Sequence, residues 1–450
     1  MTKTTKVTAQ NSECNLPGIS MDINSKGVLQ IGEKDINELV DKFGTPLLVY
    51  DEKEIRKNIN EYLDTFKENY PYFKVLYAGK AFLNRTLCKI LQEEGTGLDV
   101  VSGGELFIAL NAGFNPPDIY FHGNNKLEKE IVLALENDTG KFVIDNFHEA
   151  ELVNKLAADR NKKVEVLVRI IPGIKAHTHE YIQTGQIDSK FGVGFTDNQA
   201  FKLIKRCLNY ENLIFKGLHA HIGSQIFTIE SYQKLVEIIF KFLSEIKEKT
   251  GKIIEEIDLG GGLGISHNRN ENPPSIEEFV KALCNKVKKE AEEYDFPLPV
   301  LSIEPGRSII GTAGITLYEI GSIKQVPGLT KYVAINGGMT DNIRPALYKA
   351  EYEAFVASSK SESEKEVVTV AGKCCESGDI LIEDVKLAEP RTGDILAVPG
   401  TGAYTYSMSN NYNGIPRPAV VLVNESEANI INARESYRDL ISNDIIPEGY

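Results

Sequence analysis

A repeated alternation of short β-rich runs and longer helical stretches, from about Phe73 to Arg307, constrains the fold more than any other feature of the sequence. Eight apolar runs alternate with amphipathic segments of helical period, which is the pattern of a parallel sheet built from βα units. The runs are KVLYAGK (74–80), GLDVVS (97–102), IYFHG (119–123), KFVID (141–145), VEVLVRI (164–170), FKGLHAHIG (215–223), IEEIDLGG (254–261) and VLSIEPG (300–306). Eight units predict an α/β chain with a closed (β/α)₈ barrel of the TIM type, and an open doubly wound sheet is the alternative.

The sequence pattern changes after Arg307: apolar and polar residues alternate, and no long helical stretch occurs. This pattern predicts an all-β C-terminal domain with antiparallel strands. The segment before the barrel indicates a strand, a helix and a second strand, and its first strand is expected to pair with the C-terminal sheet. The predicted organisation is a mobile N-terminal extension (1–25), a segment contributing to the β domain (26–50), the barrel (51–310) and the C-terminal β domain (311–450).

Composition excludes several classes of protein. The chain is 42% hydrophobic and 25% charged, and its six cysteines form no CxxC pair, so neither a disulfide scaffold nor a cysteine-based zinc site is expected. The net charge of −14 argues against a nucleic-acid partner. No run approaches the roughly 18 apolar residues of a membrane span. We therefore expect a cytoplasmic protein with no membrane partner and no metal.

Polar residues follow the predicted barrel strands at their carboxyl ends, where barrels of this type carry their reactive groups. Uncharged loop residues would serve as well if this rim only met water, so the polar set predicts a site. The polar members of this set are Lys80, Asp99, His122, Asp145, Arg169, His221, Glu304 and Arg307, and they are accompanied by Gly260, Gly261, Gly262 and Gly306.

Two of these ends point to a phosphate. The glycines at 260–262 follow the seventh strand, and Gly306 and Arg307 follow the eighth. Exposed backbone N–H groups at these two loops are a recurrent phosphate site in (β/α)₈ barrels. The alternative for the glycines is a close-packed turn, because glycine also permits positive φ.

Lys80 ends an otherwise apolar strand. Burial at the barrel mouth is expected to depress its pKa and leave an amine able to form a Schiff base, and the alternative is an ion pair with Asp99 or Asp145. An amine, a phosphate cradle and a carboxylate on one rim together suggest pyridoxal 5'-phosphate. Glu304 is the expected partner of the ring nitrogen, since an anion there keeps it protonated.

Longer motifs carry a family resemblance. They are YAGKA (77–81), FHGNNK (121–126), HAHIGSQ (219–225), DLGGGLGI (258–265), EPGR (304–307), MTDNIRPALY (339–348), CESGD (375–379) and GAYTYSMSNNYNG (402–414). In order and register they resemble the fold-type III pyridoxal-phosphate amino-acid decarboxylases, and within them the diaminopimelate decarboxylases. The resemblance implies a small-molecule amino-acid substrate and a homodimer whose active sites are shared between subunits.

The resemblance also implies residue roles. Lys80, Cys375 and His221 correspond to catalytic residues, with His221 stacked on the cofactor ring and Cys375 returning a proton. The cofactor set is Lys80, Asp99, Arg169, His221, Ser224, Gly261, Gly262, Glu304, Gly306, Arg307 and Tyr404. The substrate set is Arg307, Arg344, Tyr348, Glu376 and Tyr404, with Cys375 and Glu376 supplied by the partner subunit.

The implied reaction is decarboxylation of meso-2,6-diaminopimelate to L-lysine and CO₂, the last step of lysine biosynthesis. Arg344 would clamp the distal carboxylate and Glu376 the distal amine, which argues against substrates with a distal ammonium alone. An amino-acid racemase and a catalytically silent regulatory relative are the competing hypotheses.

A few features depart from the family pattern or stay outside the expected site. YAGKAF has a smaller residue before the lysine and lacks an asparagine two positions after it, and Cys374 precedes the family's cysteine. His177, His179 and His267 are expected in loops or at the surface. His122 and His219 are expected to support the site or to be satisfied barrel residues.

Overall fold

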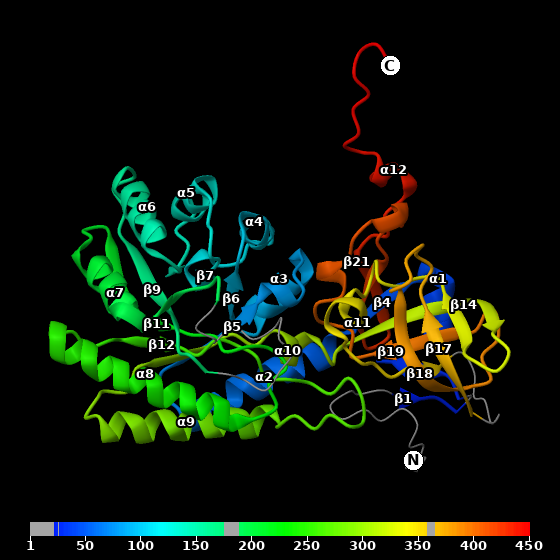
Figure 1. The fold of residues 1–450 in the computed structure, drawn as a ribbon, viewed down its shortest axis with the longest axis horizontal. Coiled ribbons are helices and arrows are strands. Elements are labelled where there is room, and N and C mark those ends of the chain that lie inside the picture. The colour runs from blue at the N-terminus through cyan, green and yellow to red at the C-terminus, as the bar shows by residue number, and fades with distance from the viewer. Residues whose placement is uncertain (1–21, 26, 175–188, 358–364) are drawn as a thin grey trace, which may run out of the picture.

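Eight parallel strands close into a barrel in the part of the chain that the structure describes (Figure 1). The computed structural model describes residues 22–25, 27–174, 189–357 and 365–450. Closure follows from the pairing of β8 with both β7 and β9, so the barrel is confirmed and the open sheet is excluded. The barrel strands are β5 (Phe73–Ala78), β6 (Gly97–Val100), β7 (Ile119–Phe121), β8 (Lys141–Ile144), β9 (Val164–Ile171), β11 (Leu213–His219), β12 (Glu256–Asp258) and β13 (Val300–Ile303).

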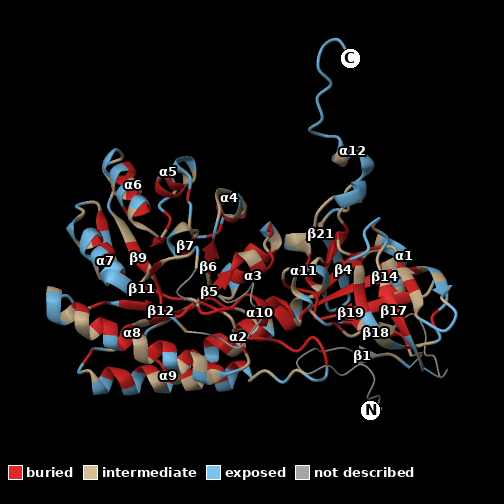
Figure 2. Cartoon of the chain, viewed as in Figure 1, coloured by how far each residue is buried: buried red, intermediate tan, exposed pale blue. Residues whose placement is uncertain are grey.

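Helices surround the barrel and bury one apolar face each against it (Figure 2). Local sequence sets their ends: the longest, α8, stops at Gly251, whose φ of 69° suits glycine. Ser275 and Glu278 form a capping box that starts α9. The helices are α2 (Glu52–Asn69), α3 (Arg85–Glu93), α4 (Gly103–Asn111), α5 (Glu128–Glu136), α6 (Phe147–Ala158), α7 (Gln199–Asn209), α8 (Ile229–Thr250), α9 (Ile276–Glu293) and the short α10 (Arg307–Ile310).

A β domain lies beside the barrel (Figure 1). Its strands are β14 (Gly314–Gln325), β15 (Lys331–Ile335), β16 (Phe355–Val356), β17 (Lys365–Ala371), β18 (Ile380–Ala388), β19 (Ile395–Pro399), β20 (Ala419–Asn424) and β21 (Glu427–Asn432). The strand content is as predicted, but the expectation of purely antiparallel pairing is wrong. β15 pairs with β17 in parallel, and β20 pairs in parallel with β4 (Leu47–Asp51).

The segment before the barrel joins the β domain through its later strand. β4 lies between β14 and β20, and its alternate residues enter two different cores. Leu48 and Tyr50 pack with the barrel core, while Leu47 and Val49 pack on the other face. The expectation that the first strand pairs with the C-terminal sheet is wrong, because β2 (Leu29–Ile31) pairs with β1 (Asp22–Ile23) and β3 (Lys34–Asp35). Helix α1 (Ile36–Phe43) connects β3 to β4.

Several expectations stay predictions. The domain limits proposed from the sequence are among them, and the mobility expected for residues 1–25 falls almost wholly outside the described residues, as do His177 and His179. Three further short elements are β10 (Val193–Gly194), which pairs with β9, α11 (Arg344–Tyr348) and α12 (Tyr437–Leu440). Among the described helices, none combines the length and apolar character needed to cross a membrane.

Candidate active site

Lys80 lies at the carboxyl end of β5, in a turn of 3₁₀ helix (Gly79–Ala81), and faces Asp99 of β6. The distance from Lys80 Nζ to Asp99 Oδ2 is 3.6 Å. Burial alone lowers the pKa of Lys80, but the charges of Asp99, Tyr404 and Glu304 outweigh it and raise the pKa above its ordinary value. The Lys80 side chain is still 37% exposed at the open mouth, so water screens these charges. The expectation of a depressed pKa is therefore wrong for the chain alone.

The ion pair left open by the sequence forms with Asp99 and not with Asp145. Asp145 Oδ1 instead accepts a hydrogen bond of 2.8 Å from the backbone N–H of Gly192. Asp99 is 1% exposed, and neither of its carboxylate oxygens has a hydrogen-bond partner. A buried carboxylate without hydrogen bonds is costly, so Asp99 marks a place where a donor can still bind.

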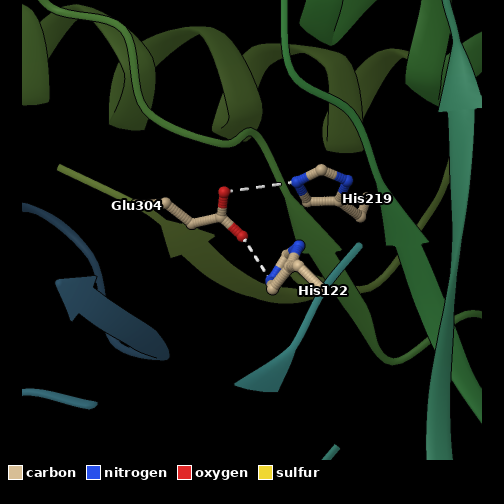
Figure 3. Close-up of side chains that lie close together, drawn as sticks. All are labelled: His122, His219 and Glu304. Atoms are coloured by element: carbon tan, nitrogen blue, oxygen red, sulfur yellow. Dashed lines mark hydrogen bonds and ion pairs between the residues drawn. The ribbon is translucent and has the colours of Figure 1, made fainter. Parts of the chain in front are cut away.

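Glu304 follows β13 and lies between two histidines, as Figure 3 shows. Its Oε1 is 2.9 Å from Nε2 of His122, which follows β7, and its Oε2 is 3.3 Å from Nε2 of His219, which ends β11. Burial alone raises the pKa of Glu304, but the contacts with His122 and His219 bring it well below the ordinary value. Glu304 therefore stays an anion, and both histidines, which were expected to support the site or to be satisfied barrel residues, contact it directly.

The same three side chains have the atom types of a metal site. One ligand atom from each of His122, His219 and Glu304 lies within 4.8 Å of the other two, and all three residues are buried. Each imidazole nitrogen already contacts a different oxygen of Glu304, which accounts for the arrangement without an ion.

Charges of both signs surround Glu304. Asp258, at the end of β12, is fully buried, and burial together with the neighbouring Glu304 raises its pKa well above the ordinary value. Asp258 is thus the protonated member of this carboxyl pair. Arg169 in β9 has its pKa lowered by burial against the opposing charges of Asp145 and Glu304, and its guanidinium lies 4.4 Å from the ring centre of Phe191.

The glycine loop after β12 is tightly packed against neighbouring backbone. A Cβ at Gly261 would lie 2.0 Å from the carbonyl oxygen of Glu304. At Gly262, with φ of +120°, a Cβ would lie 2.3 Å from the carbonyl oxygen of Gly223. These contacts require glycine for packing alone, so the alternative of a close-packed turn describes the loop as it stands.

The stronger sign of an anion site is Arg307. Its Nη2 donates to Ser224 Oγ at 3.0 Å, whereas Nε and Nη1 are buried and have no hydrogen-bond partner. Burial, with the nearby charge of Arg344, lowers the pKa of Arg307 to about 9. A buried guanidinium with unused donors is suited to a phosphate or a carboxylate. Gly306, directly before it, packs against Ala78 and Ala81.

Tyr404 and His221 complete the mouth. The β domain brings Tyr404 to the barrel, where its backbone N–H donates to the carbonyl of Ala81 at 2.8 Å and its ring lies 4.7 Å from the Arg307 guanidinium. Burial, together with the charges of Lys80 and Arg169, lowers the pKa of His221 well below its ordinary value. His221 packs against Gly260 and is neutral at physiological pH.

The predicted substrate residues Arg344 and Tyr348 lie on α11. Arg344 Nε donates to Tyr352 Oη at 2.8 Å, and its guanidinium is 5.8 Å from the Tyr348 ring centre. Tyr352 was not predicted from the sequence, because nothing local marks it as the partner of Arg344. His267 was expected in a loop or at the surface; it lies in a loop, but it is buried there and only 3% exposed.

Cys375 and Glu376 lie in the turn between β17 and β18 and are exposed. The Cys375 N–H donates to Asn413 Oδ1 at 2.7 Å, and Glu376 Oε1 accepts from the Gly378 N–H at 3.2 Å. Within the described residues, neither side chain bonds to the barrel mouth. Buried Asp379 anchors the turn by accepting the N–H groups of Met339 and Cys374 at 2.7 and 2.8 Å.

These residues fit pyridoxal phosphate. The mouth presents an amine, a permanent anion held by two histidines, and a buried guanidinium with free donors. These are the three groups needed for the aldehyde, the ring nitrogen and the phosphate of that cofactor.

Comparison with known families places the barrel in one of them. Residues 56–311, more than half of the chain, match the family described as "Pyridoxal-dependent decarboxylase, pyridoxal binding domain".

Similar proteins cover nearly the whole chain. A diaminopimelate decarboxylase of Bacillus subtilis (strain 168) is 47% identical over 422 residues, which are 94% of this chain and 96% of that protein. A crystal structure of diaminopimelate decarboxylase from M. jannaschii in complex with L-lysine superimposes with a TM-score of 0.89 at 38% identity, covering 95% of this chain and 98% of the other.

Proposed function

Because the chain belongs to the pyridoxal-dependent decarboxylases and, within them, to the diaminopimelate decarboxylases, we propose that its barrel mouth is the active site, with Lys80 as the residue that binds the cofactor covalently. The enzyme removes one carboxylate of meso-2,6-diaminopimelate as CO₂ and releases L-lysine, the last step of lysine biosynthesis. Its cofactor is pyridoxal 5'-phosphate. The racemase and silent-relative hypotheses are set aside.

When bound, the cofactor supplies an electron sink for the electrons that the departing CO₂ leaves on Cα. The observation that carries the proposed site is Glu304, held as an anion by His122 and His219, because this charge keeps a ring nitrogen protonated. We assign His221 to the face of the ring. Asp99 and Arg169 balance charge around it.

The phosphate contacts are proposed at Ser224, Gly261, Gly262, Gly306, Arg307 and Tyr404. Arg307 joins the phosphate end to the substrate end of the site, since it bonds to Ser224 and lies close enough to Arg344 for the two charges to interact.

For the substrate we propose recognition of both charges at the end remote from the reacting carbon. Arg344 and Arg307 attract the distal carboxylate, with Tyr348 and Tyr404 lining the site. Glu376 pairs with the distal amine. An amino acid that carries only an ammonium at this end would meet arginine with like charge.

The exposure of Cys375 and Glu376 supports a shared site in a homodimer. A thiol that returns a proton to Cα must be covered from bulk water, and the chain alone leaves it open. Mixing Lys80→Ala and Cys375→Ala subunits tests this arrangement. Random exchange should restore about a quarter of the wild-type activity, through one intact site in each mixed dimer. No restored activity would mean that each site is built from one chain.

We also place the enzyme in the cytoplasm. The cysteines among the described residues are free thiols, as expected in a reducing compartment.

The function is tested by measuring CO₂ release from diaminopimelate, lysine, ornithine and arginine with the same preparation. We expect release from diaminopimelate alone, because only this substrate offers a distal carboxylate to Arg344. Comparable release from lysine or ornithine would overturn the substrate assignment, and exchange of the α-hydrogen without CO₂ would indicate a racemase.

A further inference from the structure

His267 is a buried histidine next to the substrate end of the site that no role above accounts for. It follows the glycine loop and Ile265, is 3% exposed, and packs its ring edge-on against Tyr352 at 5.1 Å between ring centres. Tyr352 in turn accepts the hydrogen bond from Arg344 Nε. His267 therefore lies in the layer of side chains that holds Arg344.

The hydrogen bonds of Gln225 determine which ring nitrogen of His267 carries the proton. Gln225 Oε1 accepts from the Ile265 N–H at 3.2 Å, and its Nε2 donates to the Ile265 carbonyl at 2.7 Å, so the orientation of the amide is set by backbone. The same Nε2 lies 3.0 Å from His267 Nδ1. Nδ1 is thus the acceptor, and the proton of a neutral ring lies on Nε2.

The neighbouring carboxylate does not change this assignment. Glu271 Oε2 accepts the backbone N–H of His267 at 2.6 Å, whereas its distance to Nδ1 is 3.4 Å. Burial, outweighing Glu271, lowers the pKa of His267 to about 4, and the charges of Arg307 and Arg344 act in the same direction. His267 is accordingly neutral at working pH.

The Nε2–H donor of His267 is buried and has no hydrogen-bond partner. The same holds for Nε and Nη1 of Arg307. Leaving a buried donor unsatisfied is costly, because the group gives up its hydrogen bonds to water without replacing them. Arg307 lies close enough to His267 for its charge to lower the pKa of that histidine, so the unused donors of the two residues indicate a missing acceptor, and an anion is the acceptor that matches a guanidinium.

We propose that His267 is a specificity-determining residue whose Nε2–H donates to the carboxylate at the end of the substrate remote from the reacting carbon. This inference rests on the proposed function. The cofactor phosphate is the other anion that Arg307 could bring close. The carboxylate is favoured because His267 packs on Tyr352, which holds Arg344, the residue assigned to the substrate.

Lysine and 1,5-diaminopentane differ only in the carboxylate at one end, so comparing their affinities isolates the contribution of that carboxylate. Decarboxylation leaves lysine with the amino-carboxylate of the distal end, whereas 1,5-diaminopentane has ammonium groups at both ends and no acceptor. A neutral donor at His267 therefore stabilises bound lysine and gives nothing to 1,5-diaminopentane.

The experiment measures the dissociation constants of both ligands for the cofactor-loaded enzyme, with cofactor affinity measured separately on the apoprotein. We expect His267→Phe to weaken lysine binding about tenfold, equivalent to one hydrogen bond of about 1.4 kcal/mol, and to leave 1,5-diaminopentane within about twofold. KM for diaminopimelate should rise by a similar factor, with kcat little changed.

A pair of amide variants controls for packing. The Gln side chain can place an N–H near the position of Nε2, whereas the shorter Asn reaches only that of Nδ1. His267→Gln should retain most of the lysine affinity and His267→Asn should lose it. Since these two variants differ by one methylene, the comparison stands even if His267→Phe does not fold.

Two results would overturn the proposal. Equal effects on lysine and 1,5-diaminopentane, or none on either, would leave His267 with a packing role. A loss of cofactor affinity with an unchanged ratio between the two ligands would assign the donor to the phosphate. Failure of the wild-type enzyme to release CO₂ from diaminopimelate would instead count against the proposed function itself.

Discussion

Lys80 Nζ and Asp99 Oδ2 lie 3.6 Å apart across the ends of two neighbouring barrel strands. Asp99 is the largest of the charges that raise the pKa of Lys80. Only the neutral amine can attack an aldehyde, so in the role that we propose for Lys80 this pair stabilises the lysine in its unreactive form before the cofactor binds.

Replacing Asp99 by Asn should therefore speed cofactor attachment. With the carboxylate gone, the pKa of Lys80 falls, and the neutral fraction at pH 8 increases about tenfold for each unit of decrease. The initial rate of pyridoxal phosphate uptake by the apoprotein, trapped with borohydride, measures this effect. Asp145→Asn is the matched control, because Asp145 bonds to Gly192 instead. An unchanged pH dependence in Asp99→Asn would show that Asp99 does not control the amine.

Glu304→Gln removes the carboxylate that we propose as the partner of the ring nitrogen, and it keeps the size of the side chain. We expect kcat to fall by about 10²-fold or more, as is typical when a preorganised charge is removed from an active site. The visible spectrum of the bound cofactor should shift as well, because the ring nitrogen loses its proton. His122→Asn should give a smaller change of the same kind, since His219 still contacts Glu304. Wild-type kcat in Glu304→Gln would remove the carboxylate from the mechanism.

The sequence predicted those features that local pattern encodes. Apolar periodicity identified the eight barrel strands, and the rule that reactive groups follow strand ends identified Lys80, Asp99 and Glu304. Pairing between distant segments left no local sign: β4 joins β20 although about 370 residues separate them. The parallel pairs in the β domain were missed for the same reason.

Electrostatics and burial were the least predictable features of the site. The raised pKa of Lys80 depends on groups from another strand and from the β domain, which the sequence does not place side by side. The sequence indicates that His267 lies in a loop, but it does not indicate that this loop packs His267 against Tyr352. Whether a polar residue is buried is decided by its tertiary partners.

Cys375→Ala should retain cofactor uptake and lose turnover. A group that donates a proton in the reaction contributes about 10²–10⁴ to the rate, so kcat should fall within that range. Cys374→Ala is the control, because burial and Asp379 raise the pKa of the Cys374 thiol to about 12 and keep it inert. Equal activity in both variants would rule out a proton-donating role for Cys375.

The opposite end of the barrel holds a buried ion pair that should govern stability and not catalysis. Lys141 Nζ lies 2.8 Å from Glu256 Oε2, and Oε1 of Glu256 accepts from Tyr120 and Ser302. Lys141→Met leaves the buried carboxylate of Glu256 without its cation and should lower the free energy of unfolding by about 3–5 kcal/mol. The more exposed Lys216, paired with Glu255, should cost at most about 1 kcal/mol when replaced by Met. Urea unfolding measures both, and equal losses would contradict this difference.

Stability should fall in mild acid because burial lowers the pKa of three histidines, His219, His221 and His267. Burial lowers the pKa of His219 and of His267 to about 4 in the folded chain, whereas an unfolded histidine takes up its proton near pH 6.5. Both groups are neutral in the two states above pH 6.5, so their stability contribution is full there. It is lost as the pH decreases towards 4, because only the unfolded state binds the protons, and each histidine accounts for about 3 kcal/mol over this window. The midpoint of urea unfolding between pH 7 and 4.5 tests the sign. In His267→Gln the urea midpoint should depend less steeply on pH than in the wild type, whereas in His148→Gln, at an exposed position, the dependence should match the wild type. If His267→Gln does not alter the slope of the midpoint against pH, His267 does not titrate in this range.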